Sequence, residues 1–284
     1  MTRRTFSKLG AAAPLVLSVP AIARITSRID GVIIGAQTYS FRDLPLDRCI
    51  SSMHDIGLGY AEFWIDKMLP PDPEKRKAWL WNPPMDEVKS VRKSFDDAGI
   101  QIYAVNYSFR DEWTDEQIEK GFEVTRALGT NKITASSNVD ISARVDKFAQ
   151  QYQTYVGFHN HDSMKPNEFS TPDDWKKAME GRSKYIGINL DIGHFTAAGF
   201  DPLTFLEEHH AQILTLHLKD RKKSHGPNMP WGQGETNIHD VLQVLRRKKY
   251  PIPAMIEYEY NQPGMDTFAE VTKCFNYCKQ ALAN

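Results

Sequence analysis

An aspartate and a histidine stand three residues apart where an apolar run ends, in the segment GINLDIGHFTAAGFDP (residues 187–202). The run is typical of a buried strand, and Asp201-Pro202 is typical of a helix start. A carboxylate buried at the end of such a strand is costly unless it is paired or binds a cation. Asp191 and His194 are therefore candidates for metal binding or for acid–base chemistry.

Other apolar runs also end in polar side chains that could bind a metal or carry a proton. They are Glu62, Asn106, His159 and His161, His217 and Lys219, and Glu257 and Glu259. Side chains alternate along a strand, so the two members of each pair share a face. A mixed nitrogen and oxygen set suits Mn²⁺, Zn²⁺, Co²⁺ or Fe²⁺ better than Mg²⁺. Ligand-type residues at four consecutive strand ends, from His159 to Glu257, predict a divalent-metal site.

Each of these residues also has a purely structural interpretation. His194 could cap backbone groups in its turn, His159 could be a hydrogen-bonded core histidine, and Glu62 could pair with a neighbouring cation. Trp79 and Trp81, in the long connection 65–84, could cover the rim of the fold. The coincidence of position favours the metal site over these alternatives.

The elements that would position these residues alternate regularly along the chain. From residue 31 onward, eight apolar strand-like runs are interleaved with helical patterns, such as 85–99 and 114–129. Eight βαβ-type units over this length predict an α/β fold, a (β/α)₈ TIM barrel formed as a single domain by residues 24–284. A doubly wound sheet is the rival, but the Gly-rich turn that it predicts after an early strand is lacking. In a barrel, function lies at the carboxyl ends of the strands.

Composition limits the classes of partner. The chain has 284 residues, 41% hydrophobic content and a formal net charge of -1, which favours neither nucleic acid nor an anionic membrane. Its three cysteines form no CxxC pair, so no zinc knuckle or redox motif is indicated. We expect a small-molecule partner and leave the oligomeric state open, a homo-oligomer included.

The first 23 residues are predicted to be a signal peptide. The segment TRRTFSK (residues 2–8) resembles a twin-arginine export signal, and a short apolar run after it ends at Ala21-Ile22-Ala23. The alternative is a disordered basic N-terminus. The run is too short to span a bilayer, so we expect no stable membrane anchor and a periplasmic or secreted mature chain.

Three motifs give the chain a family resemblance that covers nearly all of residues 31–284. DIGHFTAAGFD and LHLKDRKKSHGPNMPWGQGETNI are similar to zinc-binding segments of endonuclease IV, and MIEY is similar to its strand with the last metal-binding glutamate. The chain thus resembles the xylose isomerase-like barrels, often described as sugar phosphate isomerases/epimerases. The resemblance implies one divalent ion held from strands five to eight, and it places Asp191, His217 and Glu257 on three of the ligand positions.

Two departures from the family pattern bear on function. The fourth ligand, a glutamate in the epimerases, falls on His159, which keeps metal binding but puts the two-glutamate epimerase mechanism in doubt. The Asp-x-His that completes the zinc set of endonuclease IV falls on Gly226 and Asn228. We therefore expect one ion per chain, Mn²⁺ first, with Zn²⁺, Co²⁺ or Fe²⁺ as alternatives.

The predicted function is a metal-dependent sugar isomerase or epimerase that removes a proton beside a metal-bound carbonyl. Glu257 is the expected base, His159 or His161 the acid, and Lys219 the group that stabilises the enolate oxygen. Export favours an unphosphorylated sugar or keto-glycoside. Alternatives are a lyase or hydratase of the same family, an endonuclease IV-like phosphodiesterase and a non-catalytic sugar-binding barrel. The expected substrate-binding residues are Glu62, Trp64, Trp79, Trp81, Asn106, His161, His194 and Glu259.

Overall fold

A closed barrel of parallel strands forms the centre of the computed structural model, which describes residues 23–260, 264 and 266–283. Each strand pairs with the next along the chain, and β2 pairs with β9 to close the ring. The predicted (β/α)₈ barrel is confirmed. The barrel strands are β2 (Val32–Gln37), β3 (Tyr60–Trp64), β4 (Gln101–Asn106), β5 (Lys132–Ala135), β6 (Tyr155–His159), β7 (Ile186–Asp191), β8 (Ile213–Leu218) and β9 (Ala254–Ile256).

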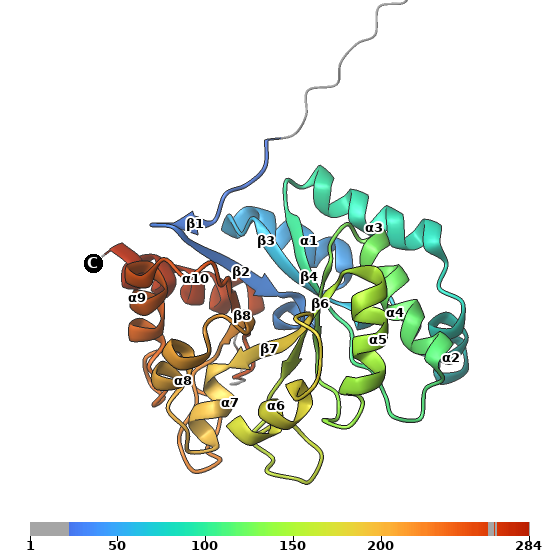
Figure 1. Ribbon diagram of the computed structural model, residues 1–284. Coiled ribbons are helices and arrows are strands. Elements are labelled where there is room, and N and C mark those ends of the chain that lie inside the picture. The colour runs from blue at the N-terminus through green and yellow to red at the C-terminus, as the bar shows by residue number, and fades with distance from the viewer. Residues whose placement is uncertain (1–22, 261–263, 265, 284) are drawn as a thin grey trace, which may run out of the picture.

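Helices surround the barrel and connect successive strands (Figure 1). Two short 3₁₀ helices, η1 (Thr38–Phe41) and η2 (Ile65–Lys67), follow the first two barrel strands. The α-helices are α1 (Leu46–Ile56), α2 (Pro73–Trp81), α3 (Met85–Asp97), α4 (Asp115–Ala127), α5 (Ser142–Tyr152), α6 (Pro172–Met179), α7 (Ile192–Ala197), α8 (Pro202–His209), α9 (Ile238–Lys248) and α10 (Thr267–Ala283).

Local sequence signals explain several helix ends. The Thr114 side chain accepts from the backbone N–H of Gln117, whose own side chain accepts from the Thr114 N–H, so a capping box begins α4. Asn237 precedes α9, where its residue type would suit a cap, but its side chain makes none. It donates instead to the carboxylate of Asp240, because its backbone lies outside the extended conformation usual for a capping residue.

The long connection after β3 is folded rather than irregular. Asp72 caps α2 by accepting from the N–H of Lys75 at 2.9 Å, and Pro73 occupies the first helical position, where no N–H is needed. This helix fixes Trp79 in the core at 6% exposure, whereas Trp81 is 43% exposed. The two tryptophans are thus held in different environments.

A short hairpin precedes the barrel. The strand β1 (Arg28–Ile29) pairs antiparallel with β2 through Asp30 and Gly31, which both have positive φ. Two positive φ angles are the requirement of a type I′ turn, for which Asp-Gly is a preferred sequence. The strand was not expected, although this signal was present in the sequence.

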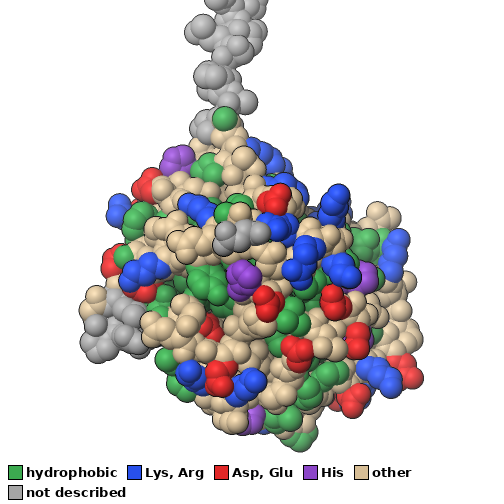
Figure 2. All heavy atoms as spheres, turned by 90° about the vertical axis from the view of Figure 1, so that its left-hand side faces the viewer, with side chains coloured by type: hydrophobic (Ala, Val, Ile, Leu, Met, Phe, Trp, Pro, Cys, Tyr) green, Lys and Arg blue, Asp and Glu red, His purple; other side chains and the backbone are tan. Residues whose placement is uncertain are grey.

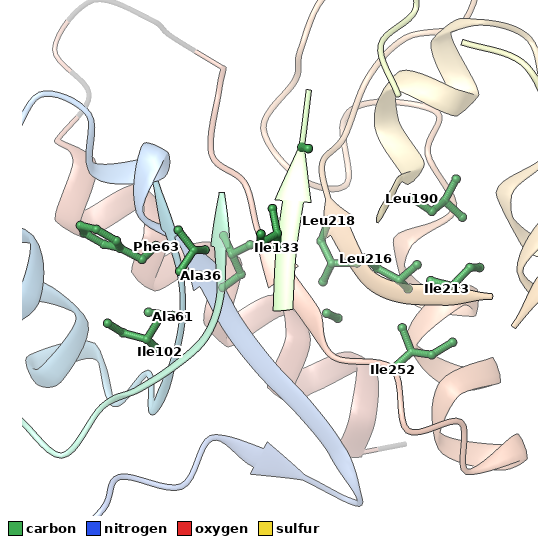
Figure 3. Packing of buried hydrophobic residues seen from close by; sticks show 14 of the residues in the cluster. Ala36, Ala61, Phe63, Ile102, Ile133, Leu190, Ile213, Leu216, Leu218 and Ile252 are labelled. Atoms are coloured by element: carbon green, nitrogen blue, oxygen red, sulfur yellow. The ribbon is translucent and has the colours of Figure 1, made fainter. Parts of the chain in front are cut away.

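The barrel strands alternate between polar and apolar side chains near their carboxyl ends. Glu62, Asn189 and His217 are flanked by apolar residues that belong to the buried hydrophobic cluster, among them Phe63 and Leu218 (Figure 3). Because neighbouring residues of a strand face opposite sides, one set packs against the helices while the other faces the barrel interior. The apolar layer thereby holds the polar set in place.

The surface is mixed in charge. On the face drawn in Figure 2, basic and acidic side chains are interspersed, in line with the near-zero net charge. Every helix within the described residues is too short or too polar to cross a bilayer. The predicted signal peptide falls almost entirely on residues 1–22, outside the described residues.

Candidate metal centre and active site

Four side chains from consecutive strands meet at the carboxyl end of the barrel. His159, Asp191 and His217 lie at the ends of β6, β7 and β8, and Glu257 directly follows β9. Each offers one ligand atom, and these four atoms all lie within 4.8 Å of one another. All four side chains are buried, with at most 6% exposure. The structure therefore brings together the four residues that the sequence had placed on one metal.

The orientation of His217 is fixed by two carboxylates. Its Nδ1 lies 3.0 Å from Oε2 of Glu257 and its Nε2 lies 2.8 Å from Oε1 of Glu62. Burial alone would lower the pKa of His217, but Glu62 and Glu257 raise it well above its usual value. Glu62 also accepts from the Thr134 hydroxyl at 2.6 Å, and Thr134 in turn accepts from Asn106 at 3.1 Å.

Glu62 therefore lies in a different place from the one expected. It is fully buried beneath the pocket, with Oε2 lacking a hydrogen-bond partner among the described residues, and it does not line the cavity above. Its contact with His217 has the form of the carboxylate–histidine pairs that orient metal-binding imidazoles. We interpret it as a positioning residue rather than as a residue that touches substrate.

His159 is held as a neutral imidazole. Its Nδ1 lies 2.9 Å from Oδ1 of Asn189, whose amide nitrogen donates to the hydroxyl of Thr215 at 2.7 Å. Because the amide is oriented by Thr215, its oxygen accepts the Nδ1–H of His159, and the Nε2 lone pair is left for another partner. Burial and the neighbouring His217 lower the pKa of His159 well below its usual value. A neutral imidazole with a free Nε2 is suited to metal ligation.

Lys219 places a cation among the same carboxylates. Its Nζ lies 3.1 Å from Asp191, 2.9 Å from Glu257 and 2.6 Å from Glu259, and it is 2% exposed. A Cβ at Gly193 would meet the backbone and stem of Lys219 at less than 3 Å, so only glycine lets α7 pack this closely. Burial would lower the pKa of Lys219, but the carboxylates outweigh it and raise the pKa.

The charges of the cluster leave room for a divalent ion. Four carboxylates, those of Glu62, Asp191, Glu257 and Glu259, surround the ammonium of Lys219 and the imidazole of His217, which binds a metal in its neutral form. Oε2 of Glu62 is buried without a hydrogen-bond partner in the described part of the chain, and Oδ2 of Asp191 is buried with the ammonium of Lys219 3.1 Å away. A buried carboxylate oxygen without a partner, such as Oε2 of Glu62, is costly unless a cation satisfies it. The donor set therefore fits one divalent ion of the Mn²⁺ or Zn²⁺ type.

A second grouping of ligand atoms involves His159, His161 and His194. Here the neighbours disfavour another cation, because Nη1 of Arg221 lies 2.6 Å from Nδ1 of His194 and Nζ of Lys219 lies 2.9 Å from its Nε2. Arg221 is paired in turn with Asp162 at 2.7 Å. His194 does not cap its own turn. Oδ1 of Asp191 does so, accepting from the His194 N–H at 2.7 Å.

An open pocket of about 310 Å³ lies above the cluster. The predicted residues Trp64, Asn106, His161, His194 and Glu259 line it, together with His159, His217, Lys219 and Glu257. Trp79 and Trp81 are not among its lining residues, since α2 holds them elsewhere, and a stacking role in this pocket is not supported for them.

Four further lining residues were missed from the sequence: Gln37, Tyr39, Ser108 and Ser136. Tyr39 packs edge-on against Trp64, with ring centroids 4.9 Å apart. Gln37 ends the first barrel strand, Tyr39 follows it and Ser136 directly follows the fourth, two strand ends for which no site residue was predicted. The same positional rule, applied to all eight strands, indicates these three, whereas Ser108 lies in the loop two residues beyond β4.

Comparison with known proteins places this site in a family. The model of the family described as xylose isomerase-like TIM barrel matches residues 50–278, and the chain belongs to that family. L-ribulose-5-phosphate 3-epimerase UlaE of Escherichia coli is 29% identical over 93 residues. That alignment spans only about a third of each protein, 33% of this chain and 32% of the epimerase.

Solved structures support the same fold. A sugar phosphate isomerase/epimerase from Parabacteroides distasonis is similar with a TM-score of 0.65 and 19% identity, covering 91% of this chain and 97% of that one. The IolI protein, whose structure contains a zinc atom, is similar with a TM-score of 0.64 and 14% identity, covering 89% of this chain and 96% of the other.

Proposed function

We propose that this protein is a divalent-metal-dependent sugar isomerase or epimerase that removes a proton from the carbon beside a carbonyl. The observation that carries the proposal is the convergence of His159, Asp191, His217 and Glu257 within 4.8 Å beneath an open polar pocket. Membership of the xylose isomerase-like family and similarity to an epimerase are consistent with it. A metal bound there would polarise the substrate carbonyl and acidify the adjacent C–H.

Three residues would handle the proton and the charge. Glu257 is the base, because its side chain lines the pocket and is ionised, since Lys219 and His217 overcome the effect of burial and lower its pKa well below the usual value. The ammonium of Lys219 stabilises negative charge on the substrate oxygen. His161 in its imidazolium form donates a proton to the intermediate and becomes neutral, while Glu257 keeps the proton that it removed, and exchange with solvent restores both groups. His159 is less suited, since its Nδ1 hydrogen is engaged by Asn189. Return to the neighbouring carbon gives an isomer, and return to the opposite face gives an epimer.

A lyase or hydratase is the second candidate from the same site. It would begin with the same proton removal and then expel a substituent from the next carbon. The replacement of the family glutamate by His159 favours keeping this alternative, because the two-glutamate arrangement for symmetric epimerisation is incomplete. An endonuclease IV-like phosphodiesterase would need more than one metal ion. The Arg221 guanidinium beside His194 disfavours a second ion there. A sugar-binding barrel without activity would show no proton exchange.

The pocket residues favour an unphosphorylated substrate. The lysine among the residues lining the pocket, Lys219, is engaged by three carboxylates. A phosphate there would face Glu257 and Glu259 and would be repelled. Export of the chain, which the twin-arginine-like segment predicts, would also place it away from cytoplasmic sugar phosphates. Replacing Arg3 and Arg4 by lysine should block export, and unchanged export would remove this part of the proposal.

Solvent hydrogen exchange tests the chemistry. Metal-loaded protein is incubated in deuterated water with unphosphorylated ketoses and keto-glycosides, with L-ribulose 5-phosphate for comparison, and exchange is followed by NMR. Glu257→Gln should lower exchange by about 10²–10⁴-fold, the usual effect of losing a general base. Metal content is measured in the same samples. Full exchange in metal-loaded Glu257→Gln would exclude this base, and no exchange by the unaltered protein would exclude the reaction class.

A further inference from the structure

A second cavity adjoins the metal-site pocket. Its volume is about 170 Å³, and it shares Trp64, Asn106 and Ser108 with the larger pocket as common lining. The connection 65–84 and the loop after β4 form its remaining walls. Since three residues line both cavities, the two lie side by side, and a ligand that passes these three side chains would occupy both.

Part of the wall of this cavity is apolar and aromatic, although polar groups make up the larger share of its lining. Leu69, Leu80 and Trp113 line it together with Trp64 and Ile65. Its Arg76 is neutralised by an ion pair with the carboxylate of Asp66, which also lines the cavity. Flat aromatic surfaces with few free charges suit the apolar face of a sugar ring or an aromatic ring.

One polar group in the wall lacks a partner. The hydroxyl of Tyr107, which lines the cavity, is buried without a hydrogen bond among the described residues, and the side chain is 1% exposed. Its ring is held by Trp113, with centroids 6.0 Å apart, and by close approach to Gly121 of α4. A buried hydroxyl that lacks a partner is unfavourable, so it would gain a hydrogen bond from a ligand oxygen once a small movement of the wall exposes it.

The wall is also fixed in place. Arg144 of α5 donates to the backbone carbonyls of Asp111 at 3.1 Å and Trp113 at 2.5 Å, and it pairs with Asp115 at 3.0 Å. These contacts tie the loop after β4 to two helices. The cavity is therefore a formed feature, since its aromatic side is held by several hydrogen bonds.

We propose that this cavity is a subsite for a second ring, so that the substrate is a glycoside rather than a single sugar. The inference rests on the proposed function, because it assumes that the reacting sugar lies over His217 and Glu257. Trp113 would stack on the second ring, and the Tyr107 hydroxyl would bind one of its oxygens. Phosphate is disfavoured because Arg76 is already engaged by Asp66, although Arg110 at the exposed edge makes phosphate the alternative to be tested.

Matched pairs of ligands test the subsite by binding alone. Phenyl and methyl glycosides of glucose, galactose and xylose, in both anomers, are titrated calorimetrically into the metal-loaded protein. We expect a phenyl glycoside to bind at least about tenfold more tightly than its methyl counterpart, which corresponds to about 1.4 kcal/mol. Trp113→Ala should abolish this difference and leave the methyl glycoside unaffected. Tyr107→Phe should weaken a disaccharide more than a phenyl glycoside.

Trp81→Ala is the matched control, because Trp81 is 43% exposed and lines neither cavity. Equal losses for both ligand sizes in Trp113→Ala, or no preference for the larger ligand, would overturn the subsite. Tighter binding of L-ribulose 5-phosphate than of L-ribulose, lost in Arg110→Ala, would assign the cavity to phosphate and overturn it as well. If substrate protons exchange but the larger glycosides do not bind more tightly, only the subsite is refuted. If the larger glycosides bind more tightly but no protons exchange, only the proposed reaction is refuted. If no sugar binds at all, both are refuted.

Discussion

Nζ of Lys219 lies 2.9 Å from Oε2 of Glu257, the carboxylate oxygen that also lies 3.0 Å from Nδ1 of His217. The same ammonium contacts Asp191 at 3.1 Å. Two of the four candidate metal ligands are thus already neutralised by a side chain of the protein. A divalent ion entering this cluster shares these carboxylates with Lys219, and this competition should be measurable.

Lys219→Met should raise the affinity for divalent ions and destabilise the metal-free protein. Without the ammonium, Asp191 and Glu257 are left as buried carboxylates with one partner fewer, and breaking a buried ion pair in this way costs about 3–5 kcal/mol. Urea unfolding with and without Mn²⁺ measures both effects. The exposed Lys147→Met is the control and should change the unfolding free energy by about 0–1 kcal/mol. Weaker metal binding in Lys219→Met would contradict the competition.

Glu62→Gln should weaken metal binding although Glu62 does not line the pocket. The substitution keeps the shape but removes the charge that orients His217, and loss of such an outer partner typically costs about 10–100-fold in metal affinity. Calorimetric titration with Zn²⁺ gives the affinity, and circular dichroism checks the fold. Unaltered affinity in a folded variant would show that Glu62 is a structural residue only.

His159→Glu introduces the glutamate that the resemblance to the epimerases implies at this position. We expect metal binding to be retained, because a carboxylate can replace the imidazole as a ligand. The metal-free variant should be less stable than the unaltered protein, since another negative charge is buried beside Asp191 and Glu257. Thermal unfolding with and without Mn²⁺ would show a larger metal-dependent increase in Tm. An unchanged increase would exclude His159 from the metal site.

Asp162 should make stability depend on acidic pH. Its hydrogen bond with His194, together with Arg221, holds the pKa of Asp162 well below its ordinary value of 3.8. A lowered pKa means that the stabilisation is present above the ordinary pKa and is lost as the pH falls below it. Asp162→Asn should therefore be less stable than the unaltered protein at neutral pH, and the difference should shrink in acid.

Urea unfolding over a pH series measures this dependence. His225 also faces Asp162, at 3.3 Å, so His194, Arg221 and His225 together set its environment. The exposed Asp55→Asn on α1 serves as the control and should show no such trend. A pH-independent difference for Asp162→Asn would indicate that the hydrogen-bond geometry, rather than the charge, provides the stabilisation.

The barrel and the cluster at its mouth could be predicted because the signals are local and repeated. Each strand is an apolar run of the right length, and each candidate ligand stands at or just beyond a strand end. Parallel strands in a closed barrel bring those ends together, so sequence position alone predicted that His159, Asp191, His217 and Glu257 would meet. The short β1 was missed although Asp30-Gly31 indicated a hairpin.

Long-range side-chain contacts could not be predicted in the same way. The pairing of Glu62 with His217 joins residues 155 positions apart and depends on the stagger of the barrel strands. The sequence also does not show that Trp113 lines the smaller cavity whereas Trp79 and Trp81 do not. The paths of the connection 65–84 and of the loop after β4 decide which aromatic side chains reach that cavity. Lys219 was expected near the substrate oxygen, but its three carboxylate partners are visible only in three dimensions.

Metal content tests the central claim most directly. The protein is purified without added metal, loaded with an excess of Mn²⁺ or Zn²⁺, desalted and analysed by elemental mass spectrometry. The account predicts one divalent ion per chain, lost in the double variant Asp191→Ala, His217→Ala and retained in Trp81→Ala. Two or three tightly bound zinc ions would contradict it in favour of an endonuclease IV-like centre. A metal-free chain that still exchanges substrate protons would contradict it in favour of Lys219 as the sole cation of the site.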